Sequence, residues 1–270
     1  MFDRTLSRRD LLRAGAAGLL TSAIPHLGQV PLFGQDRGER PKQANDVKIV
    51  TPRGRVPISF IIDDSTCLAN LAYFGIPHFA EVYPDRYRQQ DWAKLPKEIP
   101  DTFVRKFGEW SREHGVKGKY SIVPYPACIG RIDQKLPDWS KQQLEESLKL
   151  VREFMTVDWD IHPEMATHTF AIDIKTDKPY PDHTEEFLEN TGFSVGKNAD
   201  QLAEYIAYAL RILKNVGLPC EGITTPGGFG NKVRDALSRG TMMAVQDVFK
   251  AEIPHYFRHL FTGEESVAPR

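Results

Sequence analysis

Short apolar runs alternate with amphipathic helical patterns along most of this chain, and this alternation constrains its fold more than any other feature. The apolar runs predict strands at 58–62, 120–123, 164–170 and 222–225. Apolar residues at helical spacing predict helices at 101–115, 140–154, 202–217 and 231–248, with Asp101, Ser140 and Asn231 as N-caps. Strands that alternate with helices are typical of a parallel sheet, closed as a barrel or open as a doubly wound layer. Active sites in both forms gather at the C-terminal ends of the strands.

Two adjacent carboxylates, Asp63 and Asp64, follow the first predicted strand. Side chains alternate along a strand, so the two carboxylates are expected to point to different sides and to do different jobs. One is suited to hold a metal, while the other acts as a base on water. A solvated strand end or a helix N-cap would explain the same pair without any chemistry.

A histidine, His168, lies where the third predicted strand should end. Neutral imidazole is a common zinc ligand, although a lone histidine is more often structural. His162 lies six residues earlier. In an extended chain at ~3.3 Å per residue the two histidines would be about 20 Å apart, so they share a metal only if the chain bends.

The fourth predicted strand runs into the sequence Thr-Thr-Pro-Gly-Gly at 224–228. A tight loop of this kind can bring backbone N–H groups to a ligand. We therefore expect Thr225, Pro226 and Gly227 to form a substrate loop.

Taken in order, these strand ends resemble the polysaccharide deacetylase family, the NodB-homology carbohydrate esterases. Residues 60–64 match its first motif, a strand that ends in an Asp pair, and residues 119–123 match the strand that follows. Residues 164–169 match the first half of its histidine motif, and residues 224–228 keep the Pro and Gly of its Arg-x-Pro-x-Gly motif. The resemblance covers roughly residues 56–250 and implies a distorted (β/α) barrel.

The resemblance also implies roles for single residues. Asp63 would be the catalytic base, and Asp64 and His168 would be ligands of a divalent metal, expected to be zinc. The second histidine ligand of the family falls on Ile172, which cannot bind a metal, so Asp173 or the more distant His183 would supply the third ligand.

Two further departures bear on activity. Thr224 replaces the arginine that orients the catalytic carboxylate in the family. The chain also ends about forty residues after the third motif. It is therefore expected to be either a fragment or a member whose barrel is incomplete at the C-terminus.

The N-terminus predicts an export signal. Arg8 and Arg9 precede a stretch rich in Leu, Ala and Gly that is too short to span a membrane. Twin arginines before such a stretch are a bacterial export signal read by the twin-arginine machinery. We expect a signal peptide at 1–26, a linker at 27–50 and one domain at 51–270, in a periplasmic or extracellular protein.

Bulk composition excludes several classes of protein. Lys plus Arg number 35 and Asp plus Glu 36, a balance that gives no argument for nucleic acid or an anionic membrane surface as partner. No segment after the N-terminus is apolar for long enough to cross a bilayer. The three cysteines are too few and too widely spaced for a disulfide framework or a CxxC zinc site, which leaves one bridge or three thiols.

These patterns favour an exported metal-dependent hydrolase that removes acetyl groups from an N-acetylated carbohydrate. An alternative of another class is a carbohydrate-binding or scaffold module without turnover, which Ile172 and Thr224 favour. A third possibility is an amide hydrolase that acts on a substrate other than a sugar.

Overall fold

The computed structural model of this chain describes residues 58–252 and 254–256. The predicted signal peptide and linker, with Arg8 and Arg9, lie outside the described residues. So does the start of the predicted domain, at 51–57.

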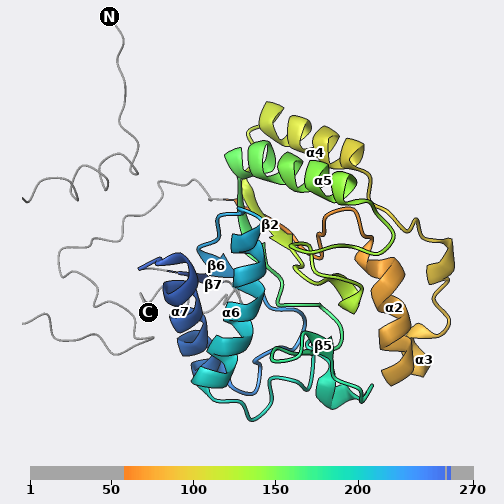
Figure 1. Ribbon diagram of the computed structural model, residues 1–270, viewed down its shortest axis with the longest axis vertical. Helices are drawn as coiled ribbons and strands as arrows, with labels where there is room; N and C mark the ends of the chain where they lie inside the picture. The colour runs from red at the N-terminus through yellow and green to blue at the C-terminus, as the bar shows by residue number, and fades with distance from the viewer. Residues whose placement is uncertain (1–57, 253, 257–270) are drawn as a thin grey trace, which may run out of the picture. The chain divides into compact units, whose positions relative to one another are not determined.

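Helices and strands alternate through the described residues (Figure 1). The strands are β1 (Phe60–Ile62), β2 (Gly118–Ile122), β3 (Trp159–Pro163), β4 (Ile172–Asp173), β5 (Lys178–Pro179), β6 (Gly222–Ile223) and β7 (His255–Tyr256). The α-helices are α2 (Leu71–Val82), α3 (Pro84–Tyr87), α4 (Asp101–Glu113), α5 (Lys141–Glu153), α6 (Ala199–Asn215) and α7 (Arg234–Phe249). Single 3-10 turns are η1 (Trp92–Lys94), η2 (Pro126–Cys128), η3 (Met155–Val157) and η4 (Glu185–Phe187).

The central sheet is parallel, as the alternation predicted. It has the order β1-β2-β3, with Ile61 opposite Lys119 and Lys119 opposite Asp160. Beyond β3, a parallel bridge joins Glu164 to Thr224 next to β6, and β6 pairs in parallel with β7. The mixed α/β class is therefore confirmed. No sheet among the described residues closes, so they do not show a barrel.

The third strand lies earlier than predicted. It occupies Trp159–Pro163, and the segment 164–170 forms no regular strand after it. Met165 and His168 have positive φ angles of 50° and 64°, which an extended strand does not allow. The strand was missed because the charged Asp160 interrupts its apolar pattern.

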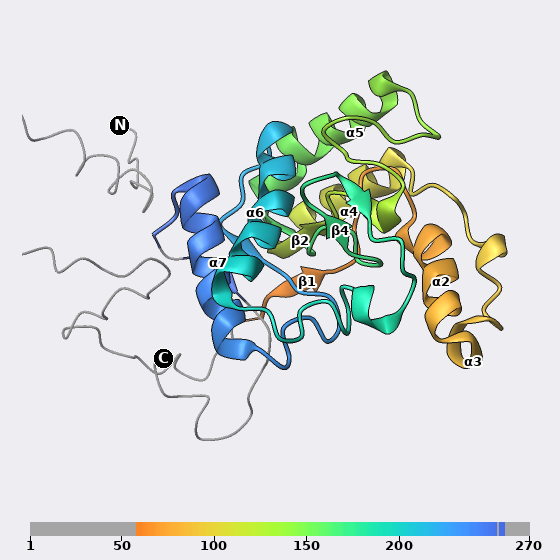
Figure 2. The same ribbon diagram turned by 60° about the horizontal axis from the view of Figure 1, so that its bottom comes forward.

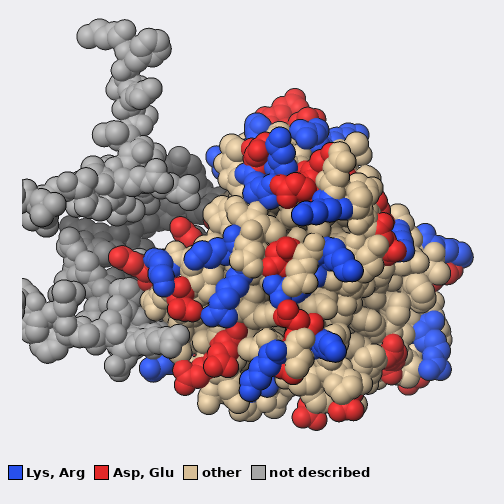
Figure 3. Space-filling view, in the orientation of Figure 1, with Lys and Arg blue, Asp and Glu red and all other residues tan. Residues whose placement is uncertain are grey.

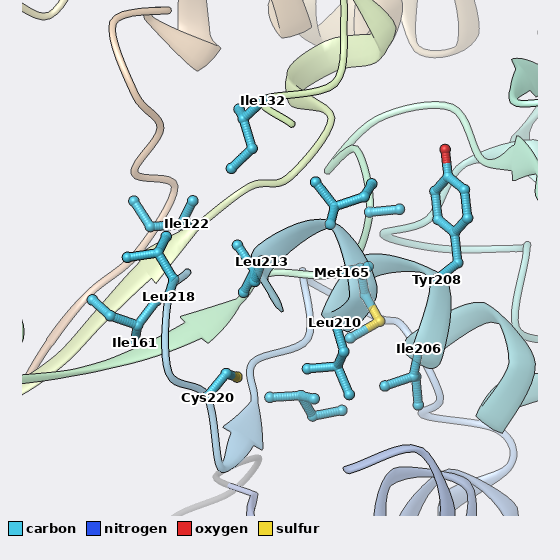
Figure 4. Close-up of a cluster of buried hydrophobic side chains, with 14 of the residues drawn as sticks. Ile122, Ile132, Ile161, Met165, Ile206, Tyr208, Leu210, Leu213, Leu218 and Cys220 are labelled. Atoms are coloured by element: carbon cyan, nitrogen blue, oxygen red, sulfur yellow. The ribbon is translucent and has the colours of Figure 1, made fainter. Parts of the chain in front are cut away.

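One face of the central sheet is apolar and carries the core. Tyr120 and Ile122 of β2, and Trp159 and Ile161 of β3, are all buried on it. Helix α6 covers part of this face with a row of buried side chains. Figure 4 shows that row meeting the sheet, with Ile206, Leu210 and Leu213 of the helix close to Ile122, Ile161 and Met165. Helices α6 and α7 pack side by side (Figures 1 and 2).

The structure confirms one of the three predicted helix N-caps. Ser140 forms the predicted N-cap of α5, in a capping box with Gln143. Asp101 is the first residue of α4 and not its cap, and its carboxylate accepts a hydrogen bond from Ser147 on α5 at 2.7 Å. Asn231 does not cap α7, because that helix begins at residue 234.

Helix α2 was not predicted. Pro77 and Gly75 lie inside it, and both residues lower helix propensity, so the segment resembles a loop in sequence. The Asn70 side chain starts the helix by accepting a hydrogen bond from the N–H of Ala72. Close packing explains the small residue at position 75, because a Cβ there would lie 3.1 Å from the Thr169 methyl group.

Charge is mixed over the described surface. Basic and acidic side chains are interspersed on the face drawn in Figure 3. Within 58–252 and 254–256, no helix has the length and apolar character needed to cross a bilayer. Cys67, Cys128 and Cys220 are free thiols, and Cys67 and Cys220 are buried.

Replacing Gly118 with alanine is expected to lower the free energy of unfolding by about 2–3 kcal/mol. A Cβ at this position would collide with the backbone carbonyl of Phe60, across the ladder between β1 and β2. Urea unfolding followed by circular dichroism measures the change. Gly115→Ala is the control, because its Cβ would meet nothing within 4 Å and only its positive φ opposes the change. Equal losses in the two variants would contradict the close approach of β1 to β2.

Candidate metal centre

Three side chains that could each give one ligand to a metal converge beyond the ends of β1 and β3. They are Asp64, Glu164 and His168, and their ligand atoms all lie within 4.8 Å of one another. Nε2 of His168 is 2.7 Å from Oδ1 of Asp64 and 3.3 Å from Oε1 of Glu164. The backbone N–H of Asp64 donates to Oε2 of Glu164 at 2.7 Å. The cluster therefore joins residues 100 positions apart in the chain.

The backbone turns sharply at two members of this cluster. Asp64 has a φ of 57° and His168 a φ of 64°, both in the left-handed region that residues with a Cβ seldom adopt. Such conformations cost of order 1–3 kcal/mol each and persist where the surrounding structure imposes them. The turn at His168 also brings its imidazole back to Glu164, four residues earlier, which an extended strand would not do.

A side chain of β2, the middle strand of the sheet, links the residues that follow β1 to those that follow β3. The Ser121 hydroxyl, on β2, donates to Oε2 of Glu164 at 3.1 Å and accepts from the N–H of Ser65 at 3.4 Å. Ser121 is fully buried. One oxygen of Glu164 thus meets two donors and has a fixed position.

A second buried carboxylate, Glu189, holds the loop that carries His168. It accepts hydrogen bonds from the backbone N–H groups of Ala166, Thr167 and His168, at distances of 2.7–3.2 Å. The Tyr205 hydroxyl of α6 donates to the same carboxylate. Glu189 is fully buried, and burial raises its pKa to about 7 although these hydrogen bonds pull the pKa down. Few alternative positions are open to His168 while all of these bonds hold.

The protonation of the cluster follows from its contacts. Burial alone would lower the pKa of His168, but hydrogen bonds to Asp64 and Glu164 and their charges outweigh burial and raise the pKa to about 10. Burial raises the pKa of Asp64, but the hydrogen bond and charge of His168 outweigh it and hold that pKa below its usual value. The pKa of Asp63 is raised, first by burial and then by the charge of Glu164. The adjacent carboxyls Asp63 and Asp64 therefore differ in acidity.

The donors fit a zinc ion in type, and one of their separations fits it as well. Zinc accepts imidazole nitrogen and carboxylate oxygen, and ligand atoms around a tetrahedral zinc lie about 3.4 Å apart at bond lengths of ~2.1 Å. The separation of 3.3 Å between His168 and Glu164 matches that spacing, and the pair of His168 and Asp64 is closer because it is hydrogen-bonded. Glu164 is the third residue of the cluster that could hold a metal ion.

A pocket of about 470 Å³ opens beside Asp63, Asp64 and His168. Ser65, Thr66 and Asn70 complete its polar lining, and aliphatic and aromatic side chains form most of the rest. Those apolar residues include Leu71, Ile76 and Phe79 of α2, Tyr87 of α3, and Phe103, Val104 and Phe107 of α4. The segment that holds α2 and α3 therefore contributes a wall of this pocket.

The other two proposed third ligands lie in different surroundings. The Asp173 carboxylate accepts from the N–H of Lys175 and from the Thr176 hydroxyl, in the turn between β4 and β5. His183 stacks on Phe170 with ring centroids 4.2 Å apart, and its Nδ1 pairs with Glu81 of α2. The structure brings neither residue into the cluster.

The predicted substrate loop is shaped by packing against another loop. The N–H of Gly228 donates to the carbonyl of Asn190, so this amide is already used. Gly227 has a φ of 44°. Thr224 is buried at the bridge to Glu164, and its hydroxyl has no hydrogen-bond partner among the described residues. The role of Thr225, Pro226 and Gly227 toward a substrate stays a prediction.

Sequence reasoning missed two acidic residues of the site. Glu164 had a usable signal, because it lies four residues before His168 and a single bend brings two such residues together. Glu189 had none, since its partners are backbone N–H groups of a distant loop whose course depends on the whole fold.

Comparison of this chain with protein-family models, with curated proteins and with solved structures finds no match.

Proposed function

We propose that this chain is a metal-dependent hydrolase of non-peptide amide bonds that removes the acetyl group from an N-acetylated carbohydrate. The observation that carries the proposal is the convergence of Asp64, Glu164 and His168 on one point, with the separate carboxylate Asp63 next to it. Two carboxylates and an imidazole are suitable zinc ligands, and a further carboxylate is the usual partner of such a site.

Each residue then has one task. Asp64, Glu164 and His168 would hold the metal, and Glu189 fixes the backbone from which His168 projects. A bound zinc would act as a Lewis acid, which polarises the amide carbonyl and lowers the pKa of a water molecule. Asp63 takes a proton from the attacking water and later returns it to the leaving amine.

The fold proposed with this function is the distorted barrel of the polysaccharide deacetylases. The parallel strands support it. The sheet β1-β2-β3 and the pair β6-β7 are linked by the parallel bridge from Glu164, which follows β3, to Thr224, which follows β6. Strands that follow one another around a sheet in chain order are what an α/β barrel requires. Export by the twin-arginine route and a periplasmic or extracellular location belong to the same proposal and rest on Arg8 and Arg9.

The apolar pocket favours a second candidate, an amide hydrolase for a substrate other than a sugar. Sugars are recognised by hydrogen bonds and by stacking on aromatic rings, whereas this pocket offers mainly aliphatic and aromatic surface away from the carboxylates. Burial of an apolar acyl or aryl group there would contribute about 25 cal/mol for each Å² removed from water.

One assay separates these functions. Zinc-loaded protein is incubated with N-acetylglucosamine oligomers and, in parallel, with N-acyl aromatic amides, and the released acid is quantified. Acetate release from the oligomers supports the first candidate, and release from the aromatic amides alone supports the second. Turnover of neither substrate, in protein that binds zinc, would favour a binding or scaffold module.

Zinc affinity is expected to rise with pH. The pKa of His168 is about 10 in the metal-free protein, so zinc must displace a proton from the imidazole at neutral pH. The apparent Kd should fall by about tenfold for each pH unit, from about pH 6.5 to about pH 8.5. Competition with a chelating dye measures it. A Kd that does not change over this range would show that zinc displaces no proton from His168.

A further inference from the structure

Helix α2 presents an apolar face to the pocket beside the metal centre. Ala72, Ile76 and Phe79 line the pocket, and they follow one another at intervals of four and three residues, which places them on one face of the helix. From Ala72 to Phe79 this face is about 10 Å long, because an α-helix rises about 1.5 Å per residue. The wall is therefore much longer than the single methyl group of an acetyl substituent.

Helix α4 adds Phe103, Val104 and Phe107 to the same pocket. Val104 is buried, whereas Phe103 is 63% exposed and so lies at the rim. An exposed aromatic ring that continues an apolar pocket is surface that a bound apolar group would cover. At about 470 Å³ the pocket is within the range of about 300–1,000 Å³ that holds small organic ligands.

The polar side chains of the lining already donate hydrogen bonds within the protein. The Ser65 hydroxyl donates to the backbone carbonyl of Asp63 at 3.4 Å, and the Thr66 hydroxyl donates to a backbone carbonyl three residues on. The side-chain amide of Asn70 donates to the carbonyl of Pro96 at 2.7 Å. A hydroxylated ligand would therefore lose hydrogen bonds to water here and regain few, whereas an alkyl chain has none to lose.

We propose that this pocket binds an alkyl chain of the substrate, whose amide group lies at the end of the pocket formed by Asp63, Asp64 and His168. The inference rests on the proposed function, because it takes the reaction at the metal centre to be amide hydrolysis. It deepens that function by naming the substrate class, an amide that carries an alkyl chain on its acyl or its amine side. A chain bound along α2 leaves the amide beside the metal ligands, since one pocket holds both.

Binding to the metal-free protein tests the pocket without turnover. Octanamide and acetamide carry the same amide group and differ only in chain length. Each buried methylene group should tighten binding by about threefold to fourfold. Octanamide should therefore bind at least about 100-fold more tightly than acetamide in isothermal titration calorimetry.

Two substitutions in the lining, each with a matched control, locate the chain. Ala72→Phe fills the pocket from α2 and should weaken octanamide binding by at least about tenfold. Ala93→Phe is its control, since Ala72 and Ala93 are both exposed and Ala93 does not line the pocket. Phe103→Ala removes part of the rim and should weaken binding by about threefold. Val157→Ala should not, because Val157 has the same exposed fraction and lies outside the lining.

Two isomeric amides show which side of the scissile bond carries the chain. N-ethyloctanamide has the chain on the acyl side, and N-octylacetamide has it on the amine side. Hydrolysis adds one water across the amide C–N bond, and it gives octanoate and ethylamine from the first isomer and acetate and octylamine from the second. With zinc-loaded protein, one isomer should have a kcat/KM at least about 100-fold above that of N-ethylacetamide, and Ala72→Phe should lose most of this gain.

The pocket and the proposed function fail in different ways. Equal affinity of the wild type for octanamide and acetamide, or octanamide binding that Ala72→Phe leaves unchanged, would overturn the pocket proposal, even if N-acetylglucosamine oligomers are hydrolysed. If zinc-loaded protein hydrolyses no amide, the proposed function fails alone. Tight octanamide binding that Ala72→Phe removes and Ala93→Phe keeps would still support the alkyl pocket.

Discussion

Replacing Asp63 with asparagine is expected to lower kcat by about 10²–10⁴-fold, the usual contribution of a general base. Asparagine has the same shape but cannot accept the proton from water. Zinc affinity should be unchanged or slightly weaker, because Asp63 is adjacent to the metal cluster and not a member of it. Steady-state kinetics on the best substrate of the panel, together with a dye competition for zinc, measures both effects.

Asp173→Asn is the matched control for this variant. It removes a carboxylate that takes part in the turn between β4 and β5 and makes no contact with the cluster. Its kcat should equal that of the wild type. Full activity of Asp63→Asn would remove the base from the mechanism, and an equal loss in Asp173→Asn would place the chemistry elsewhere.

Replacing Glu189 with glutamine is expected to lower the free energy of unfolding by about 2–4 kcal/mol. The side chains have nearly the same volume, but the amide keeps a single acceptor oxygen for the N–H groups of Ala166, Thr167 and His168. At least one buried donor then loses its partner, at a cost of about 1–3 kcal/mol, and the others lose a charged acceptor.

The same substitution should also weaken zinc binding, by about 10–100-fold, because partners beyond the ligands orient them. Urea unfolding and zinc competition test the two effects separately. Glu204→Gln on the exposed side of α6 is the control and should change stability by no more than about 0.5 kcal/mol. Wild-type stability in Glu189→Gln would show that the loop is held by something other than this carboxylate.

Local patterns predicted much of the fold. The apolar alternation located β2, α5 and α6 because each of these elements buries a regular face. It located β1 by its apolar run alone, because Phe60 and Ile61 are exposed. It misplaced β3, where Asp160 breaks the pattern, and it missed α2, where Pro77 lies inside the helix. Sequence periodicity reports which faces are buried. Periodicity alone does not detect a helix that contains a proline, such as α2, or a strand with a charged side chain in its middle, such as β3.

The sequence predicted only those site residues that directly follow a predicted strand or lie at its expected end. Asp63, Asp64 and His168 stood out because they follow apolar runs, and the structure places all three beside one pocket. The third ligand was sought downstream, at Asp173 or His183, because the second histidine of the motif that the chain resembles falls on Ile172. The positive φ at Met165 and His168 folds the chain back instead, so Glu164 lies at the cluster. Single-sequence patterns do not encode such a reversal.

Zinc titration of the metal-free protein tests most directly whether Asp64, Glu164 and His168 form one metal centre. Isothermal titration calorimetry of the wild type should give one equivalent bound. His168→Ala and Glu164→Gln should each abolish that binding or weaken it by at least about 100-fold. Asp173→Asn and His183→Ala should bind as the wild type does. A wild type that takes up no zinc, or a site that survives in Glu164→Gln and disappears in His183→Ala, would contradict this metal centre.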